Sequence, residues 1–227
     1  MRESLKIILN LAVKDLKVEF RRPHEISSIL AFSLASVLAL SFTWDGGIAI
    51  SSQITFPTIW VLLYFSSIYL FATSFIREMD QGTIDGLKTL PCSSNLILYG
   101  KIIYSIILLT AIAAVLIPSS IIFLNILIPL HILLSEFIVL MLGVVGLSLA
   151  GSLISALVMF SEGKQLLIAF LLFPISLPFL IPCITATVKV TSGFTLLEIL
   201  PEIEIIMSFI ILTALISSLF FKLVFSE

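Results

Sequence analysis

Six long runs of apolar residues decide what this chain can fold into. Each run is long enough to cross a bilayer as a helix, because about 20 residues at a rise of about 1.5 Å span the hydrocarbon. A transmembrane β-barrel would need apolar and polar residues in alternation, whereas stretches such as 106–109 and 166–170 are apolar at every position. The predicted spans are residues 26–44, 54–76, 102–124, 137–160, 165–188 and 205–221.

The composition indicates the same class of protein. Hydrophobic residues make up 59% of the 227 residues, charged residues only 11%, and the mean hydropathy is +1.24, values that exclude a soluble domain. The sequence therefore predicts an all-α integral membrane protein in which residues 1–227 form a single transmembrane domain. Any soluble activity must come from another chain, and a net charge of −2 gives no reason to expect nucleic acid as a partner.

The distribution of positive charge predicts the orientation. Lys and Arg near the ends of spans stay in the cytoplasm. With a cytoplasmic N-terminus and six crossings, eleven of the twelve Lys and Arg residues fall on the cytoplasmic side, and only Lys189 lies outside. We expect a multi-pass protein of the inner or plasma membrane with both termini in the cytoplasm.

Residues 1–23 form a unit of their own, which Pro23 ends. Apolar residues follow the spacing of one helix face, and polar residues line the other face. This pattern predicts an interfacial amphipathic helix that lies flat on the lipid of the cytoplasmic leaflet, with Arg21 and Arg22 near lipid phosphates. The alternative is an ordinary basic flank of the first span. The apolar face comprises Leu5, Ile8, Leu9, Ala12, Val13, Leu16 and Phe20.

Residues 77–100, between the second and third spans, contain signals for a bend, a helix start and a helix end that a simple turn does not need. Gly82 suits a sharp bend, Thr83 can cap a helix, Asp85 suits the first helical turn, and Pro91 ends the segment. The sequence predicts a short helix in a cytoplasmic loop that is offered to a soluble partner. The alternative is a solvated loop with no partner. The predicted apolar edge toward the partner comprises Ile84, Leu87 and Leu90.

Two other spans have unusual compositions. Pro174, Pro178 and Pro182 recur at every fourth position of the fifth span, and each removes a backbone donor. Either the helix breaks there beside a polar translocation path, or neighbouring helices and Ser176 satisfy the freed carbonyls. The fourth span is rich in small residues, which favour close packing within the chain or a subunit interface. After the fifth span, residues 194–200 form either a short re-entrant helix or a surface loop. The small residues are Gly143, Gly146, Ser148, Gly151, Ser152 and Ser155.

No catalytic or metal site is predicted. The pairs at 100–101 and 163–164 have the Gly-Lys of a phosphate-binding loop but lack its upstream Gly and its following hydroxyl, so this chain does not hydrolyse ATP. His24 and His131 fall near opposite membrane faces, too far apart to share a metal. Cys92 and Cys183 also fall on opposite sides and cannot pair.

Several segments together resemble known permeases. The loop resembles that of ABC-2 type transporter permeases through Arg77-Glu78, Gly82-Thr83, Asp85, Leu87, Pro91 and Gly100-Lys101. The whole chain resembles the haem exporter protein B (CcmB) family of cytochrome c maturation through Phe56-Pro57-Thr58-Ile59-Trp60-Val61, Phe65-Ser66-Ser67, Asp85-Gly86-Leu87, Leu90-Pro91, Phe173-Pro174, Leu177-Pro178 and Ile181.

The resemblance implies an ABC-2 type permease fold and a non-catalytic subunit that pairs with an ABC ATP-binding subunit. It implies that the loop helix is a coupling helix, which docks on the ATPase. It also implies a homodimer, or pairing with a second permease, to complete the transporter. The residues to which it gives the coupling role are Glu78, Gly82, Thr83, Ile84, Asp85, Leu87, Leu90 and Pro91.

The implied function is delivery of haem, beside a haem-handling membrane protein, to a haem chaperone outside the membrane. Either haem is the transported substrate, or ATP hydrolysis drives release of the loaded chaperone. The haem-handling partners in that system are recognised by a Trp-rich outer segment, whereas this sequence has only Trp44 and Trp60. No bound cofactor and no haem ligand are therefore assigned to this chain. The alternatives are an ABC-2 exporter of lipid, drug or polysaccharide, and a membrane scaffold that transports nothing.

Overall fold

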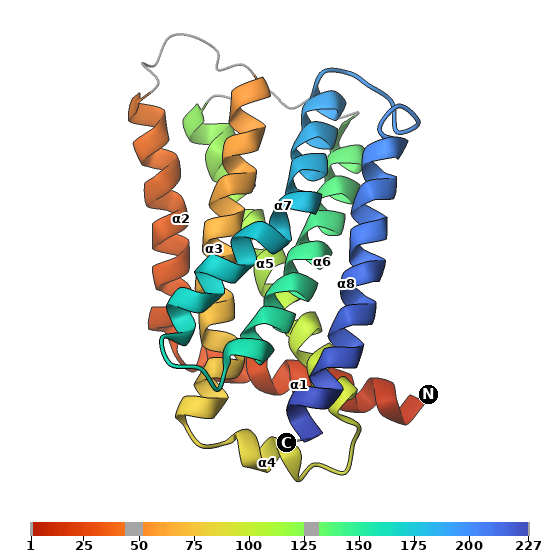
Figure 1. Cartoon of the computed structure of the whole chain (residues 1–227). Coiled ribbons are helices and arrows are strands. Elements are labelled where there is room, and N and C mark those ends of the chain that lie inside the picture. The colour runs from red at the N-terminus through yellow and green to blue at the C-terminus, as the bar shows by residue number, and fades with distance from the viewer. Residues whose placement is uncertain (1, 44–51, 125–131, 227) are drawn as a thin grey trace.

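The described part of the chain is a bundle of helices. The computed structural model describes residues 2–43, 52–124 and 132–226. Long helices stand side by side, α1 lies across one end of the bundle, and α4 lies at that same end (Figure 1). The helices are α1 (Arg2–Phe20), α2 (Pro23–Thr43), α3 (Ser52–Asp80), α4 (Ile84–Lys88), α5 (Ser94–Leu124), α6 (Leu133–Val158), α7 (Lys164–Thr191) and α8 (Leu200–Ser226).

Six of these helices, α2, α3, α5, α6, α7 and α8, are long and apolar enough to cross a membrane. The prediction of an all-α membrane protein with six spans is therefore confirmed. Most of the helices extend beyond the predicted spans, although α6 ends at Val158, two residues before its predicted end. The extension is clearest for α3 and α5 at the end that carries α4. There α3 continues past residue 76 to Asp80, and α5 begins at Ser94 rather than at 102. A span predicted from hydropathy stops at the first charged residues, whereas the hydrogen bonds of the helix continue through those residues.

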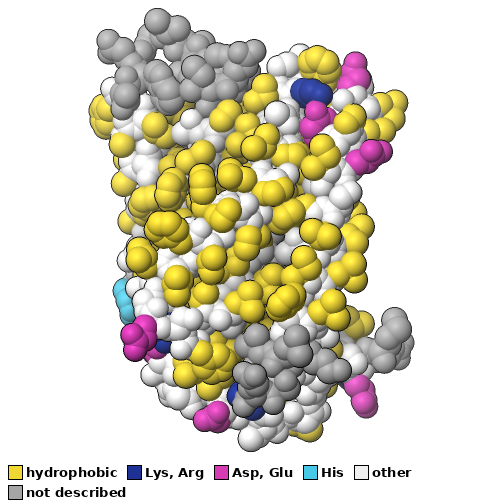
Figure 2. All heavy atoms as spheres, in the orientation of Figure 1, with side chains coloured by type: hydrophobic (Ala, Val, Ile, Leu, Met, Phe, Trp, Pro, Cys, Tyr) yellow, Lys and Arg dark blue, Asp and Glu magenta, His cyan; other side chains and the backbone are white. Residues whose placement is uncertain are grey.

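The surface of the bundle matches a hydrocarbon environment. Figure 2 shows hydrophobic side chains over the middle of the bundle, with charged side chains near its two ends. Large apolar side chains such as Phe170, Ile122 and Leu219 are 74%, 72% and 67% exposed. A soluble protein does not present so much contiguous apolar surface to water. Lipid is therefore the solvent for this band.

The small residues of α6 allow close packing within the chain. Trp60 of α3 lies against Gly143, where an added Cβ would come within 2.2 Å of the indole ring. At Gly151 an added Cβ would lie 2.1 Å from the ring of Phe71. The Ser155 hydroxyl donates to the carbonyl oxygen of Phe71 at 2.9 Å. The prediction that small residues serve packing within the chain is confirmed for these contacts.

Helix α7 continues through all three of its prolines, from Lys164 to Thr191. It bends near its middle (Figure 1), as proline-containing helices do. Pro174 and Pro178 are exposed on the outside of the bundle, whereas Pro182 is buried. Ser176 donates to the carbonyl oxygen of Phe173 at 3.0 Å. The helix is thus bent and not interrupted, and whether a translocation path runs beside it stays a prediction.

The segment between α7 and α8 is a loop of turns. Gly193 has a φ of +92°, and Phe194 and Leu197 are exposed. The Glu198 carboxylate accepts hydrogen bonds from the backbone N–H and the hydroxyl of Thr195, at 2.7 and 2.9 Å. These two bonds lower the pKa of Glu198 below its ordinary value. Of the two alternatives for residues 194–200, the structure shows the surface loop.

Helix α1 packs across α5. An added Cβ at Gly100 would lie 2.8 Å from the Cβ of Leu11, so only glycine allows this close crossing. One edge of the predicted apolar face, with Ala12, is buried against the bundle, whereas Leu9 and Phe20 are 53% and 68% exposed. The exposed edge is the surface that an interfacial helix presents to lipid.

Candidate functional site

The turn between α3 and α4 confirms the sharp bend predicted at Gly82. Gly82 has a φ of +65°, which glycine adopts without strain. Its N–H donates to the carbonyl oxygen of Met79 at 3.1 Å, and the N–H of Thr83 donates to the carbonyl oxygen of Glu78 at 2.9 Å. This pair of bonds is the Schellman motif, which satisfies the last carbonyls of a helix. The start of α4 is therefore held rigidly at the end of α3.

The capping role predicted for Thr83 is wrong. Its side chain makes no capping hydrogen bond to α4, and its hydroxyl instead donates to the carbonyl oxygen of Glu78 at 3.2 Å. The physical reason is the backbone of Thr83, which has φ −91° and ψ −2°. An N-cap residue needs the extended region to point its oxygen at the helix start. Thr83 thus helps to end α3 rather than to begin α4.

The predicted direction of the apolar edge of α4 is also wrong. Ile84 and Leu87 are 5% and 7% exposed. They pack into a cluster, here called the basal core, at the end of the bundle, and only Leu90, at 38%, is substantially exposed. Burying each side chain stabilises by about 1.5–3 kcal/mol, so α4 turns its apolar side inward. The basal core comprises Phe75, Ile84, Leu87, Ile97, Leu98, Ile102, Leu149, Ala156, Met159 and Phe221.

The surface that α4 presents outward is polar. Asp85 in its first turn, Gly86, Lys88 and Thr89 are exposed, and Pro91 follows in the exposed segment after the helix. The ammonium group of Lys88 lies 5.8 Å from the ring centroid of Phe160, in the turn between α6 and α7. A partner that docks here contacts charged side chains and backbone, because the apolar side chains of α4 are already packed in the basal core.

A network of buried charges lies at the same end, and sequence reasoning did not find it. Lys101 of α5 is 4% exposed, and its ammonium group lies 3.1 Å from Asp15 of α1 and 3.1 Å from Glu78 of α3. Lys14 lies 2.8 Å from the same Glu78 oxygen and 3.2 Å from Asp15. These four residues join three helices. Glu78, to which the resemblance gives a coupling role, is 8% exposed within this network.

A second set of polar contacts continues the network. The guanidinium of Arg77 pairs with Glu19 of α1 at 2.8 Å and with Glu25 of α2. The hydroxyl of Tyr104 donates to the same Glu19 carboxylate at 2.9 Å. Arg22 lies 3.4 Å from Glu25. Lys14 and Arg22 lie at the exposed edge of the network, with side chains 44% and 42% exposed. The set, here called the buried ion network, comprises Lys14, Asp15, Glu19, Arg22, Glu25, Arg77, Glu78, Lys101 and Tyr104.

Partial signals for this network exist in the sequence. Asp15 and Glu19 are four residues apart and continue the helix face that begins with Ile8 and Ala12, so acids stand where apolar residues are expected. Lys101 is an isolated charge in a long apolar helix, and such residues pair with one another inside membrane proteins. Which acids pair with which cations depends on how α1 crosses α3 and α5.

A polar cavity of about 280 Å³ lies within the network. Within the described residues, Glu78 Oε2 and Ser74 Oγ are buried without a hydrogen-bond partner, and both residues line this cavity. The cavity is large and polar enough to hold water. Burial acts to lower the pKa of Lys14, but the Asp15 and Glu78 carboxylates outweigh burial and raise that pKa above its ordinary value. Lys14 thus stays charged at neutral pH.

The remaining candidate residues lie apart from this end or carry no site. Lys164 at the start of α7 pairs with Asp80 at the end of α3, which fastens the turn before α7. The His24 side chain is 74% exposed, 3.8 Å from Glu25, and His131 lies outside the described residues. Cys92 and Cys183 are free thiols. No cluster of His, Cys, Asp or Glu suited to a metal occurs among the residues that the structure describes.

Comparison with known families agrees with this architecture. No curated protein is similar enough to match the chain. The model of the CcmB protein family matches residues 6–223, which includes α1 after its first turn, α4 and the six spanning helices. The chain therefore belongs to the CcmB family, the haem-export permeases of cytochrome c maturation.

Proposed function

We propose that this chain is the membrane subunit of an ABC transporter and that a separate ATP-binding subunit docks on the outward surface of α4. The observation that carries the proposal is the setting of α4: a short ordered helix fixed at one end by the Gly82 turn and anchored below by the basal core. A passive loop needs neither feature. The chain has no phosphate-binding loop of its own, so ATP hydrolysis belongs to the partner.

Force applied to α4 has a defined route into the bundle. Ile84 and Leu87 belong to the basal core, to which α3, α5, α6 and α8 also contribute side chains. Arg77 and Glu78, in the last turns of α3, are ion-paired with α1. Because packed cores are close to rigid, a push on α4 moves these helix ends together instead of deforming the loop. We infer that α1 belongs to the same mechanical unit as α4.

The orientation follows from this assignment. ATP is a cytoplasmic fuel, so the end with α1 and α4 faces the cytoplasm, which is also where Lys and Arg are concentrated in the sequence. The described end of α8 lies there too (Figure 1). Both termini are then cytoplasmic. As in other ABC transporters, two permease chains are needed, so we propose a homodimer or a pair with a second permease.

The proposed output is delivery of haem outside the membrane, with a haem-handling membrane protein and a haem chaperone as further partners. In one version haem itself is transported, and in the other ATP hydrolysis releases the loaded chaperone. Complementation of a strain that lacks the gene tests this function. Restored c-type cytochromes support it, and normal c-type cytochromes in the uncomplemented strain contradict it.

Docking on α4 is tested by reversing charges on its outward surface. Asp85→Arg and Lys88→Glu, made separately, are expected to reduce capture of the co-expressed ATP-binding subunit by about tenfold or more, because misplaced charge at an interface costs several kcal/mol. Thermal stability should change by less than about 0.5 kcal/mol, since both side chains are exposed. The measurement is co-purification in detergent.

Glu204→Arg is the matched control, since this exposed carboxylate lies on α8 near the opposite end of the bundle. It should leave capture unchanged. Equal capture by the wild type and both α4 variants would place the ATPase elsewhere. Leu87 is unsuitable for this test because it is 7% exposed, and a charge there would disturb the basal core as well as any docking.

A further inference from the structure

A large apolar cavity opens at the end of the bundle opposite α4. Its volume is about 560 Å³, and it lies between α3, α5 and α6, with one residue from α7. Most of its walls are Phe, Leu, Ile and Trp side chains, among them Ile59, Leu116, Phe137 and Leu140. This cavity is separate from the buried ion network and from the surface of α4. Its occupant must be largely hydrocarbon.

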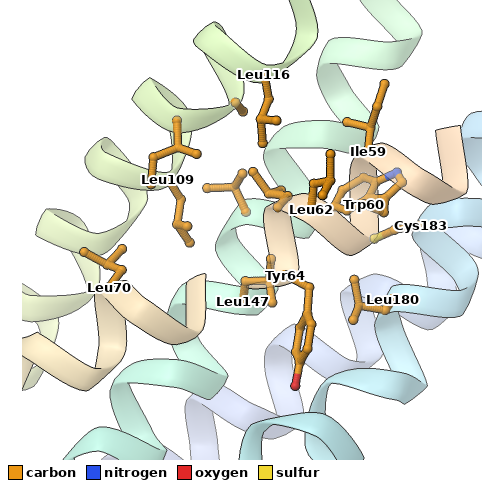
Figure 3. Close-up of a cluster of buried hydrophobic side chains, with 14 of the residues drawn as sticks. Ile59, Trp60, Leu62, Tyr64, Leu70, Leu109, Leu116, Leu147, Leu180 and Cys183 are labelled. Carbon is orange, nitrogen blue, oxygen red and sulfur yellow. The ribbon is translucent and has the colours of Figure 1, made fainter. Parts of the chain in front are cut away.

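One wall of the cavity is held firmly in place. The indole N–H of Trp60 donates to the hydroxyl of Thr187 at 3.1 Å. The ring lies over Gly143, where no side chain competes for the space, and beside Cys183 (Figure 3). Because packing and a hydrogen bond fix the Trp60 side chain, this wall of the cavity keeps its position without a ligand. The cavity is therefore pre-formed, which lowers the cost of binding.

The depth of the cavity corresponds to one leaflet. Its deepest α5 residue, Ala113, lies eleven residues before the end of α5 at Leu124, which is about 16 Å along the helix axis. Glu136 lies in the first turn of α6, one residue before the start at 137 that hydropathy predicts for this span. Half of a hydrocarbon core of about 30 Å is about 15 Å. The cavity thus reaches from the headgroup level to the middle of the bilayer.

The polar group of the cavity is a carboxylate. Glu136 lines the cavity, and its Oε1 atom is buried with no hydrogen-bond partner among the described residues. The described lining contains no Lys, Arg or His that could pair with an ionised Glu136. An anionic ligand, including one with carboxylate groups such as haem, would find no cationic partner among these side chains. A cationic group that can donate hydrogen bonds would be stabilised.

We propose that this cavity binds a phospholipid with a primary amine headgroup, such as phosphatidylethanolamine, from the leaflet opposite α4. One acyl chain occupies the apolar cavity, and the ammonium group donates a hydrogen bond to Glu136. The length of an acyl chain matches the depth of the cavity, and the positive charge of the ammonium group complements the Glu136 carboxylate. The proposal does not depend on docking of an ATPase.

Native mass spectrometry of the purified protein tests the proposal, with phosphatidylethanolamine, phosphatidylcholine and phosphatidylglycerol of identical acyl chains as probes. We expect the ethanolamine lipid to be retained about tenfold more than the other two, because the choline headgroup has no N–H donor and phosphatidylglycerol is anionic and has no ammonium group. Glu136→Gln should remove most of this preference. Ala113→Leu, which narrows the apolar cavity, should lower retention of all three lipids.

Glu204→Gln is the matched control and should retain the preference, since that carboxylate is exposed on α8 at the same end and does not line the cavity. Equal retention of the three lipids by the wild type would overturn the proposal. So would an unchanged preference in Glu136→Gln that folds normally by circular dichroism. A change of oligomeric state in Ala113→Leu, with lipid retention unchanged, would show that a helix of a second copy occupies the cavity.

Discussion

Lys101→Met is expected to lower the free energy of unfolding by about 3–5 kcal/mol. Lys101 is 4% exposed, and its ammonium group lies 3.1 Å from both Asp15 and Glu78. Removing the cation leaves two buried carboxylates with Lys14 as their remaining cationic partner in this part of the network. The expected shift in melting temperature is about 10 °C, measured by circular dichroism of the purified protein in detergent.

Two further variants show whether the loss comes from charge. Lys6→Met removes a cation from the exposed face of the same end of the bundle and should change stability by less than about 0.5 kcal/mol. Adding Glu78→Gln to Lys101→Met removes one of the stranded charges and should restore a large part of the loss. If Lys101→Met melts at the same temperature as Lys6→Met, the buried ion network does not stabilise the bundle.

Gly151→Ala is expected to destabilise the bundle by about 3 kcal/mol, at the upper end of the usual cost of overpacking. A Cβ at this position would lie 2.1–2.4 Å from ring atoms of Phe71, which is itself fully buried. The ring cannot move aside without displacing its neighbours in a close-packed interior. The change should appear as a lower melting temperature and as reduced accumulation in the membrane.

Gly86→Ala is the matched control for this substitution. Nothing lies within 4 Å of a Cβ added at Gly86, which is exposed on α4. Alanine there should leave stability unchanged or raise it by about 0.5–1 kcal/mol through better helix propensity. Adding Phe71→Leu to Gly151→Ala should recover part of the loss by relieving the clash. If Gly151→Ala and Gly86→Ala are equally stable, α3 and α6 do not approach as closely as described.

Much of the fold follows from sequence because the relevant signals are local. Apolar runs of membrane length predicted the six spanning helices, and the bend at Gly82 followed from the conformational freedom of glycine. The small residues of α6 also predicted close packing, since an interface between helices in lipid needs short side chains. None of these inferences requires knowledge of which helices are neighbours.

The candidate site was harder to predict because its residues act across helices. The apolar side chains of α4 could be buried either against a partner protein or against the basal core. The sequence pattern of Ile84 and Leu87 is the same in both cases, so it does not distinguish them. The backbone angles of Thr83, which place its hydroxyl on the end of α3, likewise depend on the turn around it. The periodicity of apolar residues can be read from the sequence, but the direction in which a helix face points depends on how the helices pack.

The sequence by itself determined the class of protein, the number and approximate ends of the spans, and the sharp turn before α4, because these depend on hydropathy and local backbone freedom. Only the tertiary structure decided that Asp15 and Glu19 face inward and that Lys101 and Arg77 meet them. It also decided that α4 turns its apolar side to the bundle. Burial and ion pairing arise between segments far apart in the chain, so their partners are chosen by packing.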